Sequence, residues 1–221
     1  MSAFELGVAS FGQALVLFIL AGLVVRRNPA LCYAFGFYLL FVLVTDLAML
    51  ASPALYTRSF WLSKEILTDA LKCAVALELG ARIFGAFPGA RAMARVLLFP
   101  LLLLLISGTI YSLLGVLGSA EVQRKLAIVG DARPKIVTGT TWLFAAIAAL
   151  VLWFRLPVDP LQKAILIGFV PYLIFLKLSL QLRLANDWPP DGWLASIDTS
   201  AYLAVLVYWA RAAWRPLRQE R

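Results

Sequence analysis

About seven apolar stretches follow one another along this chain, each of roughly 20 residues, the length that crosses the hydrocarbon core of a bilayer as a helix. In that core, a segment must satisfy its own backbone N–H and C=O groups, and a helix does so. The sequence therefore predicts an all-α, polytopic membrane protein, a bundle of about seven transmembrane helices. The predicted spans are 4–25, 31–50, 60–84, 96–117, 135–154, 161–184 and 198–214.

The composition supports this prediction. Hydrophobic residues make up 62% of the 221 residues and charged residues only 14%, whereas a soluble domain is about half apolar and a quarter charged. A single water-soluble core cannot hide this surplus, so much of the apolar surface must face lipid. The spans and their short connections use nearly the whole chain, which predicts a single transmembrane domain over 1–221.

Basic residues predict the orientation, because cytoplasmic loops of membrane proteins are enriched in Lys and Arg. An extracellular N-terminus and a cytoplasmic C-terminus place the larger basic group in the cytoplasm; the inverted topology is the alternative. The same enrichment explains the net charge of +8, so nucleic acid is not an expected partner. The predicted cytoplasmic group is Arg26, Arg27, Arg82, Arg91, Arg95, Arg155, Lys163, Arg211, Arg215, Arg218 and Arg221, and the external group is Arg58, Lys64, Arg124, Lys125, Arg133, Lys135 and Arg183.

Several chemistries lack the residues they need. The chain has no histidine, which removes His-ligated haem, His-based zinc sites and Ser-His or Cys-His nucleophiles. Its two cysteines, Cys32 and Cys73, lie in different apolar stretches, which argues against a disulfide framework or a metal site. The last span lacks a central lysine that could hold retinal. We expect no enzymatic activity and no cofactor.

Charged residues concentrate in the third span, although charges in the hydrocarbon core are expensive and normally face the bundle interior. Glu65, Asp69 and Lys72 are spaced by four and three residues, which places them on one face of a helix. Lys72 lies near the middle of the span and is expected to pair with Asp69. Glu78 falls on the opposite side of the helix and is expected to pair with Arg82, four residues further on.

Polar residues in the outer halves of other spans are expected to converge on this charged face. The predicted result is a polar pocket open to the outside that binds a small polar or zwitterionic molecule. Two alternatives remain open: the ion pairs simply hold helices together, or they form a proton or ion path. The predicted ligand-binding residues are Asp46, Glu65, Asp69, Lys72, Lys177, Gln181 and Tyr202.

Three local features carry further expectations. Residues 119–134 contain both signs of charge between a serine and a proline, which predicts a short amphipathic helix on the membrane surface. Asp198 is a candidate N-cap for the last span. Pro171 lies inside the sixth span and forms either a fixed kink or a hinge.

Four segments of the sequence resemble those of a family of small bacterial seven-helix membrane proteins: Phe35–Tyr38, Thr45–Asp46, Phe60–Phe84 with its Glu65 and Glu78, and Ala201–Trp209. The architecture also resembles the seven-helix sensory modules of histidine kinases. The family implies no established activity. The resemblance does imply a multi-pass protein of the bacterial cytoplasmic (inner) membrane, and a separate partner that would read the cytoplasmic face.

The leading functional expectation is a receptor-like or sensory membrane protein with an outward-facing pocket for a small polar ligand. The alternatives are a small proton- or solute-coupled transporter and a non-catalytic structural subunit of a membrane complex. The expected partners are membrane lipid, a cytoplasmic or membrane protein and the small ligand.

Overall fold

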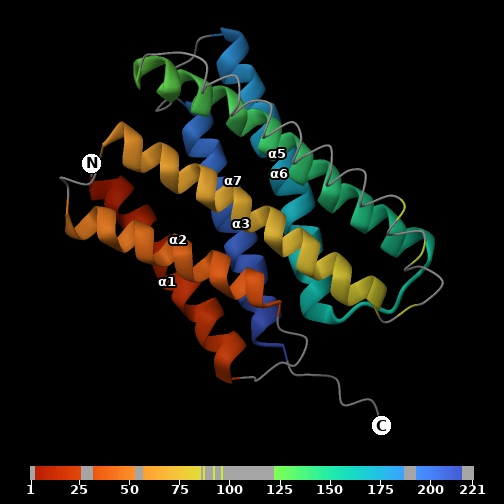
Figure 1. Ribbon diagram of the computed structural model, residues 1–221. Helices are drawn as coiled ribbons and strands as arrows, with labels where there is room; N and C mark the ends of the chain where they lie inside the picture. Colours follow the sequence, from red (N-terminus) through yellow and green to blue (C-terminus); the bar gives the residue numbers. More distant parts are fainter. Residues whose placement is uncertain are drawn as a thin grey trace.

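The computed structural model describes residues 3–25, 32–52, 57–85, 87, 92, 96, 122–186 and 193–215. All regular secondary structure in this part of the chain is α-helical, as predicted, and Figure 1 shows long helices packed along one another. The predicted span 96–117 lies almost entirely outside the described residues. The helices are α1 (Ala3–Val25), α2 (Tyr33–Ala51), α3 (Arg58–Gly85), α5 (Val122–Trp153), α6 (Pro160–Asn186) and α7 (Trp193–Ala213).

The ends of α1, α2, α3 and α6 fall within two residues of the predicted spans. In each case, the apolar run is bounded by charged residues, proline or glycine, which oppose continuation of a helix. α6 also continues through Pro171 without ending. A transmembrane helix tolerates such a proline when neighbouring groups satisfy the freed carbonyl.

Two predicted helix starts are wrong. α5 begins at Val122 and is one continuous helix through Gly130 and Pro134, so residues 122–134 do not form a separate surface helix. Proline removes one backbone donor, and this loss does not outweigh the hydrogen bonds on either side. α7 begins at Trp193, so Asp198 lies in its second turn and does not cap it.

The six described helices form a closed ring. α1 packs on α2, α2 on α3, α3 on α5, α5 on α6, α6 on α7, and α7 back on α1. α1, α3, α5 and α7 run in one direction, and α2 and α6 run in the other (Figure 1). The contacts that fix these directions are Asp46–Lys64 and Tyr33–Glu78 (α2 with α3), Trp142–Lys177 and Phe144–Phe169 (α5 with α6), Ser179–Asp198 and Phe169–Trp209 (α6 with α7), Tyr38–Tyr202 and Phe35–Trp209 (α2 with α7), and Gly12–Leu203 and Phe18–Trp214 (α1 with α7).

These directions define two ends of the bundle. We call the end where α1, α3, α5 and α7 begin the N end, and the end where they finish the C end. In the six described helices, the predicted external halves of the spans lie toward the N end. The directions therefore gather these polar residues in one half of the bundle.

A layer of four aromatic side chains fills the centre of the ring, and we call it the aromatic layer. It consists of Phe35, Phe144, Phe169 and Trp209, each at most 1% exposed. The Phe169 ring lies 4.7 Å from Trp209 and 4.8 Å from Phe144, and Phe35 meets Trp209 edge-on at 5.0 Å. The Trp209 Nε1 donates a hydrogen bond to the carbonyl of Ala164 at 3.1 Å, which satisfies its only polar atom.

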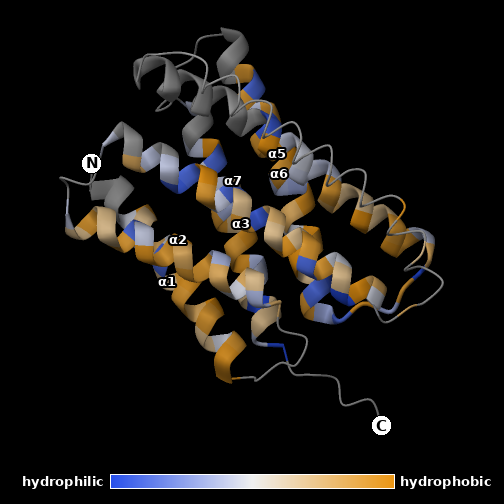
Figure 2. Cartoon of the chain, in the orientation of Figure 1, coloured by the Kyte–Doolittle hydropathy of each residue, from blue (hydrophilic) through white to orange (hydrophobic). Residues whose placement is uncertain are grey.

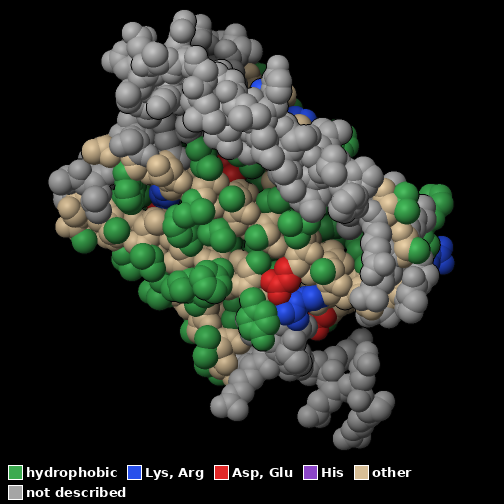
Figure 3. All heavy atoms as spheres, viewed as in Figure 1, with side chains coloured by type: hydrophobic (Ala, Val, Ile, Leu, Met, Phe, Trp, Pro, Cys, Tyr) green, Lys and Arg blue, Asp and Glu red, His purple; other side chains and the backbone are tan. Residues whose placement is uncertain are grey.

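The outside of the bundle is strongly apolar. Figure 2 shows hydrophobic residues along most of α1 and α2, and Figure 3 shows hydrophobic side chains covering much of one face. Within the described part of the chain, four helices are long and apolar enough to cross a membrane, as in a multi-pass membrane protein. α3 is not among them because of its charged residues. These segments are Gly7–Val25, Tyr33–Ala51, Lys135–Trp153 and Pro160–Leu182.

Candidate functional site

A buried ion pair lies near the middle of α3. The Lys72 Nζ is 2.7 Å from the Asp69 Oδ1, and the two residues are 3% and 1% exposed. This confirms the pairing predicted from their spacing of three residues. Both charges have left water, so the surrounding side chains must stabilise them.

Three tyrosines from three other helices cluster at this pair, and we call them the tyrosine cluster. The Lys72 Nζ lies 5.8 Å from the ring centre of Tyr172 in α6, within cation–π range. That ring lies 5.5 Å from the ring of Tyr202 in α7. The Tyr38 hydroxyl of α2 donates a hydrogen bond to the Tyr202 hydroxyl at 3.3 Å. Tyr202 was a predicted site residue, whereas Tyr38 and Tyr172 were not.

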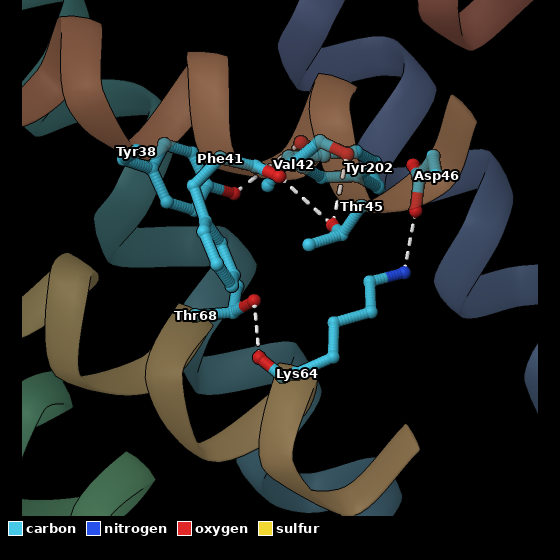
Figure 4. Close-up of polar contacts among 8 residues, drawn as sticks. All are labelled: Tyr38, Phe41, Val42, Thr45, Asp46, Lys64, Thr68 and Tyr202. Carbon is cyan, nitrogen blue, oxygen red and sulfur yellow. Dashed lines mark hydrogen bonds and ion pairs between the residues drawn. The ribbon is translucent and has the colours of Figure 1, made fainter. Parts of the chain in front are cut away.

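A second ion pair lies closer to the N end. Lys64 of α3 reaches across to Asp46 of α2, as Figure 4 shows. Both side chains are partly exposed, so this pair lies at the edge of the N-end half of the bundle, which we call the polar half. Sequence reasoning included Asp46 but not Lys64 in the site. The available signal was the spacing of Lys64, which precedes Lys72 by eight residues and so falls near the same side of the helix.

Two threonines between these pairs bond to their own helices. The Thr68 hydroxyl donates to the Lys64 carbonyl at 2.7 Å. The Thr45 hydroxyl contacts the carbonyls of Phe41 at 2.8 Å and Val42 at 3.1 Å (Figure 4). Such bonds let a polar side chain lie inside an apolar helix bundle at little cost.

A third polar link joins α6 to α7 in the same half of the bundle. The buried Ser179 hydroxyl donates a hydrogen bond to the Asp198 Oδ2 at 2.9 Å. Asp198 thus acts as an interhelical partner. Glu65, a predicted site residue, lies one turn before Asp69 in α3 and is partly buried.

Two predicted site residues lie elsewhere. The Lys177 Nζ lies 5.7 Å from the ring of Trp142, a side chain that is 58% exposed, and Gln181 is also exposed. These residues occupy the outer face of α5 and α6. Periodicity alone did not distinguish the two sides of α6, because apolar residues surround that helix on both the lipid and the core side.

At the C end, Glu78 of α3 caps the start of α2. Its carboxylate accepts hydrogen bonds from the backbone N–H groups of Tyr33 at 3.0 Å and Ala34 at 2.6 Å, and from the Cys32 thiol at 3.3 Å. It also pairs with Arg82 at 2.8 Å, as predicted. The first N–H groups of a helix need such acceptors, and here they come from a neighbouring helix.

The arrangement therefore has two polar regions separated by the aromatic layer. The N-end region offers one buried carboxylate and one buried ammonium beside phenol rings, a set suited to a zwitterion or a small polar molecule. Among the described residues, no group of three or more Cys, Asp or Glu side chains gathers to hold a metal.

Fold and site together define the chain as a helical, multi-pass membrane protein with a charged interior. Comparison with protein-family models, curated proteins and solved structures finds no match. Its function must therefore be argued from the site itself.

Proposed function

We propose that this protein is a receptor-like or sensory seven-helix membrane protein that binds a small polar or zwitterionic ligand at the Asp69–Lys72 pair. The observation that carries the proposal is this buried ion pair beneath a tyrosine cluster drawn from three other helices. One side chain from each of α2, α6 and α7 contributes to the cluster. A ligand held there would bias the packing of four helices.

The energetics favour a functional role for the pair. Desolvation of two charges offsets most or all of their Coulomb attraction, so a buried ion pair is a poor way to stabilise a bundle. Ionisable residues inside membrane proteins are accordingly associated with ligand, ion and proton sites. A zwitterionic ligand can replace the internal ion pair. Its ammonium would then pair with the Asp69 carboxylate, and its carboxylate with the Lys72 ammonium.

The aromatic layer favours a receptor over a carrier. Polar side chains lead from the Asp46–Lys64 rim to Asp69 and Lys72, and the tightly packed aromatic layer follows. A ligand that enters from the N end would stop at this layer. A proton- or solute-coupled transporter would need the layer to open, and a structural subunit would need no ligand.

Helix directions support a seventh span. α3 and α5 run the same way, so the chain must return from the C end to the N end between Gly85 and Val122. That interval contains the apolar stretch 96–117, which is long enough to cross a bilayer.

The proposed orientation places the N end outside and the C end in the cytoplasm of a bacterial cytoplasmic (inner) membrane. In the sequence, eleven basic residues belong to the predicted cytoplasmic group and seven to the predicted external group, which is the bias expected if the C end faces the cytoplasm. A signalling partner would read that face. Of the cytoplasmic group, the described residues at the C end are Arg82, Arg155, Lys163, Arg211 and Arg215, and the external group lies in the N-end halves of α3, α5 and α6.

A thermal-shift screen of detergent-purified protein against amino acids and other zwitterions tests the proposal. The key variant is the double substitution Asp69→Leu with Lys72→Met, which removes both charges and leaves no unpaired one. Lys163→Gln, an exposed site at the other end of the bundle, is the matched control. A ligand should raise the melting temperature of the wild type and of the control, but not of the double variant.

Three results would overturn the receptor proposal. An equal rise in the melting temperature of the double variant would show that the ligand binds somewhere other than the Asp69–Lys72 pair. Accumulation of the same compound in sealed vesicles would identify a transporter. A fixed partner that co-purifies, together with no ligand response, would favour a structural subunit.

A further inference from the structure

The outer face of α5 and α6 carries a lysine in an unusual setting. Lys177 is partly buried, and its Nζ lies over the exposed ring of Trp142 at 5.7 Å. No acidic residue occurs in α6 or in residues 135–153 of α5. Among the described residues, none of the three ion pairs includes Lys177. The countercharge for this cation therefore comes from neither α6 nor residues 135–153 of α5.

Depth places Lys177 near a membrane interface. The apolar sequence of α6 is interrupted by Arg183, directly after Leu182, and Lys177 lies five residues inside Leu182, about 7.5 Å at 1.5 Å per residue. A lysine side chain can span that depth and bring its ammonium toward the headgroups while its methylene groups stay in the apolar region. The nearest headgroups belong to the leaflet at the N end.

Further polar groups continue the same strip toward the N end. Lys135 precedes Trp142 by seven residues, two helical turns, and both side chains are exposed. Gln181 follows Lys177 by one turn and is exposed too. Because α5 and α6 are antiparallel, Lys135 and Gln181 both lie on the N-end side of the Trp142–Lys177 contact. Two cations and an amide therefore line one short strip at the interface.

Apolar side chains extend from this strip toward the middle of the membrane. Ile174, 44% exposed, lies about one turn from Lys177, and Ile167 lies two turns further in the same direction. Both belong to the outer surface of α6. A cationic strip at the interface with an exposed apolar surface beneath it matches a phospholipid in charge and in shape.

We propose that the α5–α6 face binds an anionic phospholipid of the N-end leaflet, with its phosphate at Lys177 and an acyl chain along α6. The Trp142 ring orients the lysine ammonium from below. This inference rests on the proposed membrane placement of the helices. It is independent of the ligand site at Asp69 and Lys72, from which it differs in face, residues and ligand.

Lipid titration followed by native mass spectrometry tests this site. The detergent-purified protein is titrated with phosphatidylglycerol and, separately, with phosphatidylcholine. One lysine near an anionic lipid surface contributes enough affinity for a change of about fivefold. Lys177→Gln should therefore weaken phosphatidylglycerol binding about fivefold, whereas Lys163→Gln, which removes the same charge from the other end of α6, should leave this site unchanged.

Other outcomes would overturn the lipid assignment. Equal weakening by Lys177→Gln and Lys163→Gln would show attraction by net charge alone. Equal binding of phosphatidylcholine would remove the requirement for an anionic headgroup. Loss of phosphatidylglycerol binding to the wild type when inorganic phosphate is added at the same concentration would identify a free-anion site. The response of Lys177→Gln to zwitterions should persist, which separates this result from a failure of the receptor proposal.

Discussion

Asp69 and Lys72 stabilise each other inside an apolar bundle, so their substitutions are not independent. Lys72→Met alone leaves the Asp69 carboxylate buried without its cation, and breaking such a pair costs about 3–5 kcal/mol. Adding Asp69→Leu removes the second charge and should restore most of the stability. Thermal unfolding of the two single variants and the double variant measures the coupling. A double variant that is no more stable than Lys72→Met would contradict a buried, mutually dependent pair.

Glu78 has a different role, because it supplies acceptors to another helix. Glu78→Ala removes the hydrogen-bond partner of two backbone N–H groups and the ion-pair partner of Arg82. Each lost hydrogen bond at a helix start contributes about 1 kcal/mol. The partly exposed pair itself contributes little. Glu78→Ala should therefore lower the melting temperature more than Arg82→Ala, and equal losses would argue against the cap.

At this scale, sequence reasoning succeeded for contacts within one helix. The Asp69–Lys72 and Glu78–Arg82 pairs follow from spacings of three and four residues. Contacts between helices depend on how each helix is rotated about its axis. An apolar sequence specifies that rotation weakly, so the tyrosine cluster and the outward position of Lys177 became visible only in the structure.

Among the helices, α6 and α7 depend on a close approach at Gly168. A Cβ added there would lie 2.3 Å from the Trp209 Nε1, whereas one added at Gly36 meets nothing within 4 Å. Gly168→Ala should displace the Trp209 ring, weaken its bond to Ala164 and destabilise the protein by about 1–3 kcal/mol. Gly36→Ala should be neutral or slightly stabilising because alanine favours helix. Paired unfolding measurements check this, and equal effects would contradict the packing.

Helix existence was predictable, and most helix ends were too, because apolar runs end at charges, proline or glycine. The starts of α5 and α7 were not. In α5, Gly130 and Pro134 resemble stop signals, yet the helix continues through them. In α7, the apolar run is preceded by polar residues that the helix also includes. Composition marks where a segment is apolar, and a helix can extend beyond that boundary.

Over the whole molecule, the ring of helices gives the polar residues their common direction. α1, α3, α5 and α7 are parallel, which brings the charged half of α3 level with the polar ends of α2, α6 and α7. The aromatic layer then separates this half from the C end. Which helices are neighbours in the ring could not be read from the sequence, because every span is apolar enough to pack on any other.

The proposed function requires the polar half of the bundle to open to the outside and to end at the aromatic layer. Cysteine accessibility tests it most directly, in a background carrying Cys32→Ser and Cys73→Ala. Thr68→Cys lies between the two ion pairs on the N-end side, whereas Ala76→Cys lies beyond Lys72 toward the C end in a fully buried position. A charged, membrane-impermeant thiol reagent is applied to each side of the membrane in turn.

If the polar half is open to the outside, Thr68→Cys should react from the outside only, a bound zwitterion should slow the reaction, and Ala76→Cys should react from neither side. Reaction of Thr68→Cys only from the cytoplasm would contradict the orientation. Reaction of both cysteines from both sides would contradict a closed aromatic layer and, with it, the receptor.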